Sequence, residues 1–469
     1  MPPLQAGAAR IRLEPPLGLA MLGYGSRVGR ASGVHDDLAA QALVIGAGAR
    51  KIVLCGVDLL AIGKRIAEEI CAEVAAHSDI PADAILIGAT HTHSAPAFNI
   101  FATPRADANV AADRSLQWER ALPGKIAAAI LAANRALETA ILKTARARFT
   151  LGTNRRLPRA DGKIQLAANY AGVADDDAIA LGAFRPDGSA IGVLLNYPCH
   201  GVVLCEDNLL YSRDWIGFAA DEIERRFTRG ADAPPITVFM QGAAGNIDPH
   251  SRGSFEVAAE HGHAAGRGIA AALDAAPTLD ASAIRGRRID LTLKLKPLDD
   301  VLAIARDCAA QTEASLANHR GGDGRQLKRL RDHHQQSLDA IRALEALEEA
   351  NRRDKRVDMA RGEMATSMSV FALGDLAIVG IPGEAFVEFG LALRASPYFA
   401  HTIVACYCND LIGYIPTREA YPLGGYEVET ARVAEGTGEA IVAAALGVMR
   451  ELRAECTALL PERRCREQS

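Results

Sequence analysis

Two histidines separated by one residue, His91 and His93, follow an apolar run at Ala84–Ala89. Such a run is typical of a buried strand, so both imidazoles are expected at a strand end, on a rigid edge of the fold. A neutral imidazole nitrogen is a ligand that suits zinc. Two polar residues that open a loop require no metal, however, so this pair alone does not establish a metal site.

Three other residues with ligand chemistry share this placement. His200, Glu384 and Tyr414 each follow, within a few residues, an apolar run that predicts a strand. With His91 they supply two nitrogen and two oxygen ligands, a set that could hold zinc and acidify a bound water. Two of them also have simpler interpretations, because Glu384 could be a carboxylate at a helix N-terminus and Tyr414 could be an ordinary buried phenol.

The predicted secondary structure explains how these side chains could meet. Strands at Ile52–Val57 and Ala84–Ala89 flank a helix at Ile62–Ala76 that has one apolar stripe. This βαβ order favours a parallel strand pair with a right-handed crossover, and ligands of α/β sheets gather at the carboxyl ends of the strands. His91 is predicted at such an end.

The remaining pattern predicts an α/β fold with mixed sheets flanked by helices, built as a single domain over residues 1–469. Residues 298–355 differ in kind, because their pattern is helical and highly charged. We expect an antiparallel helical pair inserted into the domain. A partner-binding arm is the alternative, which the single apolar stripe of each helix disfavours.

Composition narrows the class of protein. The chain has 469 residues, 49% of them hydrophobic, which is enough for a large core. A net charge of −5 argues against a nucleic-acid partner. The nine cysteines are scattered and form no disulfide framework, and neither a signal peptide nor an apolar run of about 18 residues occurs. We therefore expect a cytoplasmic protein with a small-molecule substrate and no membrane partner, and a homo-oligomer remains open.

A series of short motifs runs in order through residues 8–450. Its members are Met21-Leu-Gly-Tyr24, Gly33-Val-His35, Ala89-Thr-His-Thr-His-Ser94, Asn154-Arg155, Asn196 to His200, Ser212-Arg-Asp214, Gln241-Gly-Ala-Ala-Gly245, Pro382-Gly-Glu384, and Gly413-Tyr414 with Tyr426-Glu427. In this series the chain resembles the neutral (non-lysosomal) ceramidase family, zinc amidases that hydrolyse the amide of N-acyl-sphingosine. A set of motifs in order is far more specific than any one of them.

The resemblance implies roles for seven residues. It implies that Zn²⁺ is held by His91, His200, Glu384 and Tyr414, and that the substrate amide is faced by His93, Arg155 and Tyr426. The chemistry would be attack of a zinc-bound hydroxide on the amide carbonyl, while donors such as His93 and Tyr426 stabilise the oxyanion and protonate the leaving amine. Asp58 and Asp214 are candidates to orient the histidines, and helix capping or ion pairing is the alternative for each.

The chain departs from the family pattern in three ways. Asp248 stands where the family carries a serine proposed to be catalytic, so a mechanism that needs that hydroxyl fails here. We also expect no C-terminal β-sandwich domain and no secretion signal. These departures favour a zinc-dependent amidohydrolase that acts on a small soluble N-acyl compound or cyclic amide rather than on ceramide. The alternatives are an esterase or lactonase that uses the same site, and a non-catalytic metal-binding protein of the same fold.

Overall fold

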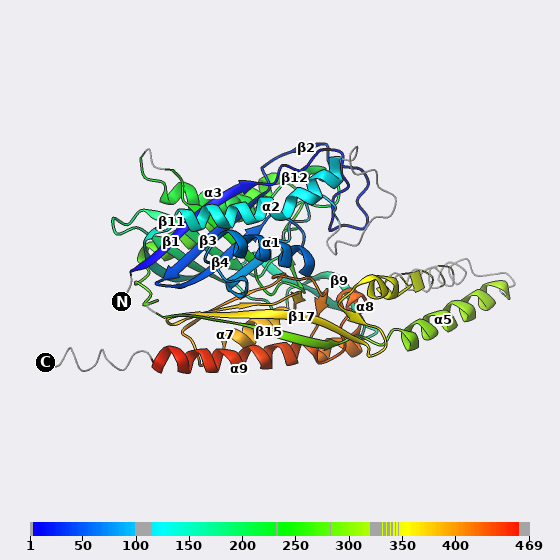
Figure 1. Ribbon diagram of the computed structural model, residues 1–469. Coiled ribbons are helices and arrows are strands. Elements are labelled where there is room, and N and C mark those ends of the chain that lie inside the picture. The colour runs from blue at the N-terminus through cyan, green and yellow to red at the C-terminus, as the bar shows by residue number, and fades with distance from the viewer. Residues whose placement is uncertain are drawn as a thin grey trace.

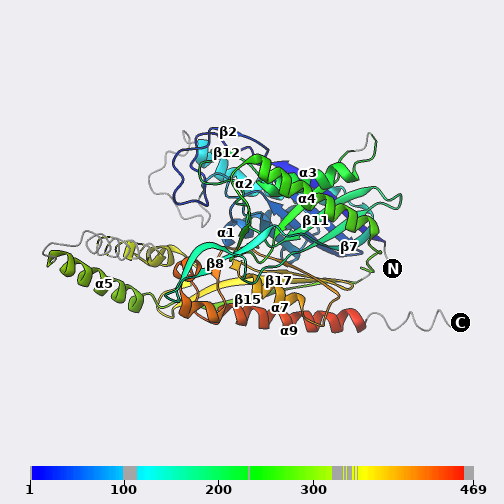
Figure 2. The same ribbon diagram turned by 180° about the vertical axis from the view of Figure 1, so that it is seen from behind.

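The computed structural model describes residues 3–98, 114–230, 233–281, 283–318 and 347–458, together with residues 331, 334, 338, 341, 342, 344 and 345. Three β-sheets face one another across a shared core, and two helices cover the outer side of each sheet (Figures 1 and 2). Leu54, Leu194 and Phe371, one from each sheet, are fully buried in that shared core. The expected α/β fold with mixed sheets is thus confirmed.

The first sheet contains the predicted βαβ unit. Its five strands have the order β5-β4-β3-β1-β6. They are β1 (Leu4–Arg12), β3 (Ala39–Ala47), β4 (Arg50–Val57), β5 (Ile85–Ala89) and β6 (Glu138–Thr139). Strands β4 and β5 pair in parallel, and α1 (Lys64–His77) connects them, preceding the short 3-10 helix η1 (Ala82–Ala84). The apolar stripe of α1 is buried, which confirms the unit.

The second helix on this sheet is α2 (Arg114–Arg135), which contains a proline in its interior. Pro123 and Gly124 usually mark a helix boundary, and yet the helix runs through both. Its N-terminal half is held by tertiary packing, because the Trp118 side chain is buried and its Nε1 donates a hydrogen bond to the Leu13 carbonyl at 2.8 Å. Packing here outweighs the local propensity of the chain.

The second sheet has the order β13-β11-β10-β7. Its strands are β7 (Ile141–Arg148), β10 (Asp177–Phe184), β11 (Ala190–Tyr197) and β13 (Ile236–Gln241). Strands β10 and β11 form an antiparallel hairpin, whose turn contains Gly188 with a φ of 82°. Strands β11 and β13 pair in parallel. The helices α3 (Trp215–Phe227) and α4 (Phe255–Ala275) pack on the outside.

The third sheet has the order β15-β17-β18-β20, with β16 paired to β17. Its strands are β15 (Ile284–Lys294), β16 (Val357–Asp358), β17 (Glu363–Leu373), β18 (Leu376–Gly380) and β20 (His401–Ala405). Strands β18 and β20 are parallel, and the helices α7 (Val387–Arg394) and α9 (Thr437–Ala458) cover the outer face. Figure 1 shows α9 along the lower side of the molecule.

A helical arm protrudes from the body between β15 and β16 (Figures 1 and 2). It consists of α5 (Asp299–Ala317) and of a returning helix whose described residues lie between 331 and 353. Leu302 of α5 packs against Leu344 of the returning helix. The described residues of both parts are helical.

Short elements at the strand ends complete the described fold. They are the two-stranded sheet of β2 (Gly33–Val34) and β12 (Leu210–Tyr211), the three-stranded sheet of β8 (Gly152–Pro158), β9 (Ile164–Asn169) and β14 (Ile247–Pro249), the pair β19 (Glu384–Ala385) and β21 (Tyr414–Ile415), the 3-10 helix η2 (Arg418–Leu423) and α8 (Tyr426–Thr430). Among the residues that the structure describes, no helix is both long and apolar enough to cross a bilayer.

Candidate active site

The three sheets direct their predicted ligand residues to one buried place. His91 follows β5 of the first sheet, His200 follows β11 of the second, and Glu384 follows β18 of the third. Ring nitrogens of His91, His93 and His200 all lie within 4.8 Å of one another, so the three histidines could hold a metal ion.

His91 and His200 are both anchored through Nδ1. His91 Nδ1 lies 2.7 Å from the Leu60 carbonyl oxygen, and His200 Nδ1 lies 2.9 Å from that of Ile247. Because a carbonyl only accepts, Nδ1 carries a proton in each ring, and Nε2 is the nitrogen left to face a ligand. Burial lowers the pKa of His91 to about 4, so this imidazole is neutral at neutral pH. Both rings thus present an Nε2 that is ready to bind a metal.

The Glu384 carboxylate faces these two nitrogens. Its Oε2 lies 3.6 Å from His91 Nε2 and 3.8 Å from His200 Nε2. Tyr407 supports both neighbours, because its Oη donates to Glu384 Oε2 at 3.4 Å and its ring stacks on His91 with centroids 4.1 Å apart. Parallel pairing of β19 and β21 sets Glu384 beside Tyr414.

Gly245 permits the close backbone contact behind Glu384. The Gly245 amide donates to the Ala385 carbonyl at 2.9 Å. A Cβ at this position would lie only 2.4 Å from the Glu384 carbonyl oxygen, so any side chain would push the ligand strand away. The glycine-rich turn after β13 is therefore a steric requirement of the site.

We expect Gly245→Ala to destabilise the protein by about 1–3 kcal/mol, as overpacking of a dense interior does. It should also weaken metal binding, because Glu384 is displaced. Urea unfolding and metal titration would measure both effects. Gly124→Ala is the matched control, since a Cβ there meets nothing within 4 Å and lies in helix α2. Equal stability of the two variants would contradict the steric account.

His93 lies beside the pair but has different surroundings. Its Nε2 is 3.3 Å from His91 Nε2. Its Nδ1 is buried and has no hydrogen-bond partner among the described residues. The Met21–Tyr24 segment covers the ring, because a Cβ at Gly23 would come within 2.4 Å of it and Tyr24 meets it edge to face at 5.0 Å. Only His93 among the three histidines thus lacks an anchored second nitrogen.

Arg155 joins the histidines to the tyrosine side of the site. Its guanidinium donates to Glu427 at 2.8 Å, to Asp248 at 3.0 Å and to the Tyr414 hydroxyl at 3.1 Å. Its Nη1 also lies 3.5 Å from His200 Nε2. The side chain is buried, so a single cation is enclosed by two carboxylates and a phenol.

Asp248 is therefore an ion-pair partner of Arg155. Burial would raise the pKa of Asp248, but Arg155, His200 and Arg252 together hold it below its usual value. Arg252 lies 3.6 Å from the second carboxylate oxygen. This carboxylate is charged at neutral pH and has no hydroxyl to offer.

Tyr426 lies at the outer side of the site. It opens α8, and 45% of its surface is exposed. Its ring meets that of Tyr414 edge to face with centroids 5.7 Å apart. All seven residues singled out from the sequence are thus linked by direct contacts or by one intervening side chain.

The two candidate orienting carboxylates have other roles. Asp58 accepts hydrogen bonds from the Ala39 amide at 3.0 Å and from Gln41 at 2.8 Å. Asp214 caps α3 by accepting from the Trp215 amide at 2.7 Å, and burial raises its pKa to about 6. The capping alternative is correct for Asp214, and backbone carbonyls orient His91 and His200 instead.

Sequence reasoning missed two partners of the site. Tyr407 lay inside an apolar run that marked it only as a strand residue. Glu427, which is 1% exposed, accepts from both Arg155 and Arg156, the latter at 2.7 Å. Its place next to Tyr426 was the one available signal.

The donor set fits a metal cation. Two anchored imidazoles and a carboxylate are a common combination, and ligands about 2.0–2.1 Å from a tetrahedral ion are about 3.3 Å apart. Glu384 Oε2 lies 3.6 Å from His91 Nε2 and 3.8 Å from His200 Nε2, and the Nε2 atoms of His91 and His93 are 3.3 Å apart. All four side chains fall within reach of one ion.

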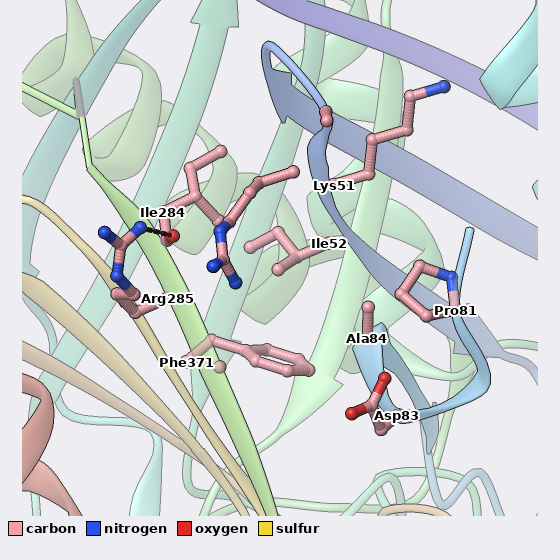
Figure 3. Close-up of a pocket in the computed structure, with 11 residues that line it drawn as sticks. Lys51, Ile52, Pro81, Asp83, Ala84, Ile284, Arg285 and Phe371 are labelled. Atoms are coloured by element: carbon pink, nitrogen blue, oxygen red, sulfur yellow. Dashed lines mark hydrogen bonds between the residues drawn. The ribbon is translucent and has the colours of Figure 1, made fainter. Parts of the chain in front are cut away.

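A separate cavity of about 440 Å³ opens at the other end of the first sheet (Figure 3). Ile52, Ile284 and Phe371 line it, with Asp83 and Arg285 among its charged groups. It lies where β4 begins, whereas the histidines follow the end of the adjacent strand β5. The cavity is therefore not part of the candidate active site.

Comparison with known proteins is consistent with this geometry. A family model described as neutral/alkaline non-lysosomal ceramidase, N-terminal, matches residues 13–267. The neutral ceramidase of Pseudomonas aeruginosa has a similar structure, with a TM-score of 0.69, 18% identity and coverage of 97% of this chain and 75% of that one. A structure described as a ceramidase complexed with C2 has a TM-score of 0.70 and 18% identity. That match covers 97% of this chain and 76% of the other. The curated proteins give no significant match.

Proposed function

The chain belongs to the neutral/alkaline non-lysosomal ceramidase family, and on that premise we propose that it is a zinc-dependent hydrolase of a small N-acyl compound or cyclic amide. Membership of the family supports a hydrolase that acts on amides. The proposal depends on one observation: the buried Nε2 atoms of His91 and His200 both lie within 4 Å of the Glu384 carboxylate. Zinc is proposed because it suits nitrogen ligands together with a carboxylate.

In this proposal His91, His200, Glu384 and Tyr414 hold the ion. When bound, zinc would supply Lewis-acid activation of a water molecule and of the substrate carbonyl. Metal-binding histidines almost always donate their second N–H to a carbonyl or carboxylate, as His91 and His200 are placed to do. His93 has no such partner among the residues described, which favours its assignment to the substrate.

The other residues would act on the amide itself. His93 can accept or deliver a proton at Nε2, the ring nitrogen on the side of His91. Arg155 fixes the Tyr414 hydroxyl and keeps a positive charge near the developing oxyanion. Tyr426 can donate its phenol hydrogen to the oxyanion or to the leaving amine. Burial of His91 and His200 excludes bulk water, which strengthens each of these interactions.

His93→Ala should keep its zinc and lose activity. A general acid or base contributes about 10²–10⁴-fold, so kcat should fall by that order. Metal analysis of the purified variant and kcat on an N-acyl substrate would measure the two effects, with His91→Ala as the variant expected to lose both. A His93→Ala protein without metal would instead place His93 among the ligands, as its 3.3 Å distance from His91 Nε2 allows.

The reaction class can be tested with matched substrates. N-acyl amides of graded chain length, cyclic amides, and esters of the same acyl groups would be compared with the zinc-loaded and metal-stripped protein. An ester is attacked more easily than an amide, so activity on esters or lactones alone would favour the alternative hydrolase. Stoichiometric zinc without turnover of either class would leave a binding protein of the same fold.

A further inference from the structure

The two site tyrosines lie on short segments outside the three large sheets. Tyr414 is in β21, a strand of two residues, and Tyr426 opens α8, which has five residues. A helix of one turn is not stable by itself, because nucleation costs more than so few hydrogen bonds return. The positions of both phenols therefore depend on what holds these segments.

Lys296, where the chain enters the helical arm, is here called the outgoing root of the arm. It binds the C-terminal end of α8. Lys296 lies between β15 and α5, and its Nζ donates to the Val428 carbonyl at 2.9 Å and to the Glu429 carbonyl at 3.0 Å. Its backbone amide donates to the Arg432 carbonyl at 2.8 Å. A lysine at the last carbonyls of a helix satisfies groups that have no partner within the helix.

Asn351 and Asp354, where the chain leaves the helical arm, are here called the returning root of the arm. They bind Arg432, which follows α8. Arg432 follows α8, and its guanidinium donates to Asn351 Oδ1 at 2.8 Å and to Asp354 Oδ2 at 2.7 Å. Asn351 is 2% exposed and Arg432 is 6% exposed, so these contacts are shielded from water. Residues from both ends of the arm thus meet around α8.

The returning root also reaches the segment that carries Tyr414. Asp354 accepts from Arg356 Nε at 2.8 Å and from its Nη2 at 2.6 Å, and Arg356 Nη1 donates to Asp410. Asp410 is 1% exposed and accepts from Thr366 at 2.6 Å. It precedes Tyr414 by four residues. One carboxylate, that of Asp354, therefore binds the arginines that hold both tyrosine segments.

From these contacts we infer that the roots of the helical arm are positioning elements for the reaction, with Lys296 and Asp354 holding the segments that carry Tyr426 and Tyr414. The inference rests on the proposed function, in which these phenols act at the amide. Neither Lys296 nor Asp354 touches the histidines, so each acts through the tyrosines alone.

The inference is tested with Lys296→Met and Asp354→Asn in the full chain. Both should lower kcat about tenfold or more with little change in KM, because Tyr426 acts at the transition state. Amide hydrogen exchange of residues 424–432 should be faster in both variants. Lys296→Arg, which can still donate to two carbonyls, should restore both quantities for Lys296. Arg306→Ala is the control in the same arm, because its ion pair with Glu345 is exposed.

Wild-type kcat and exchange in both Lys296→Met and Asp354→Asn would overturn the inference. So would an equal loss in Arg306→Ala, because the effect would then come from the arm as a whole. Hydrogen exchange separates this failure from that of the proposed function. If the wild-type protein hydrolyses no amide, the function is wrong, and exchange alone then decides whether the roots hold these segments.

Discussion

His200→Ala should remove the metal and lower kcat/KM by about 10³-fold or more, since a Lewis acid contributes several kcal/mol and each 1.36 kcal/mol is a factor of ten. His200 is fully buried, its Nδ1 is held by the Ile247 carbonyl, and its Nε2 faces Glu384. Alanine removes one of the two imidazoles whose Nε2 faces the Glu384 carboxylate. Metal content and kcat/KM on an N-acyl amide are the two measurements.

The matched control for this substitution is His77→Ala. His77 is exposed on α1 and pairs with Glu73 of the same helix, so the variant should keep its metal and its activity. A His200→Ala protein with stoichiometric zinc and an unchanged thermal midpoint would show that the ion, if bound, is held elsewhere.

Arg155→Met should destabilise the protein by about 3–5 kcal/mol, the usual result of removing one partner from a buried ion pair. The substitution leaves Asp248 and Glu427 without the cation that lies 3.0 and 2.8 Å from them. It should also lower kcat by about 10²–10³-fold, as loss of an oxyanion donor does. Urea unfolding and steady-state kinetics measure the two effects.

Asp248→Ser separates the contribution of Asp248 to the Arg155 ion pairs from that of Glu427. The serine removes one carboxylate, while Glu427 still holds Arg155, so we expect a smaller loss of stability and no gain of activity from the new hydroxyl. The variant that combines Arg155→Met with Asp248→Ser should lose less stability than the sum of the two single losses, because fewer charges are left unpaired. Arg146→Met is the surface control, since its pair with Asp177 is exposed and should contribute less than about 1 kcal/mol. A similar loss for both arginines would show that burial does not determine the effect.

The first βαβ unit and the placement of His91, His200 and Glu384 after strands could be predicted because local patterns encode them. The apolar run before His91 gave its strand to within one residue. The environment of Arg155 could not be predicted in this way, because its partners Asp248 and Glu427 are 93 and 272 residues away along the chain. Long-range pairing of this kind leaves no period in the sequence.

The course of α2 and the hydrogen-bond partners of the histidines could not be predicted from the sequence, for related reasons. The continuation of α2 through Pro123 depends on the burial of Trp118, which is a tertiary effect. The anchors of His91 and His200 are backbone carbonyls, which every residue has, so no residue type could mark them. Asp58 and Asp214 were candidates because carboxylates can be recognised in a sequence, but they accept hydrogen bonds from backbone amides instead.

A proposed ligand follows a strand of each of the three sheets, His91 after β5, His200 after β11 and Glu384 after β18. A bound ion would therefore tether parts of the chain that follow three different sheets, in addition to the apolar core that the sheets share. Metal affinity would then report how accurately that core sets the layers against one another, even for substitutions far from any ligand. The same coupling runs in reverse, so a saturating concentration of metal should raise the free energy of unfolding of the whole domain.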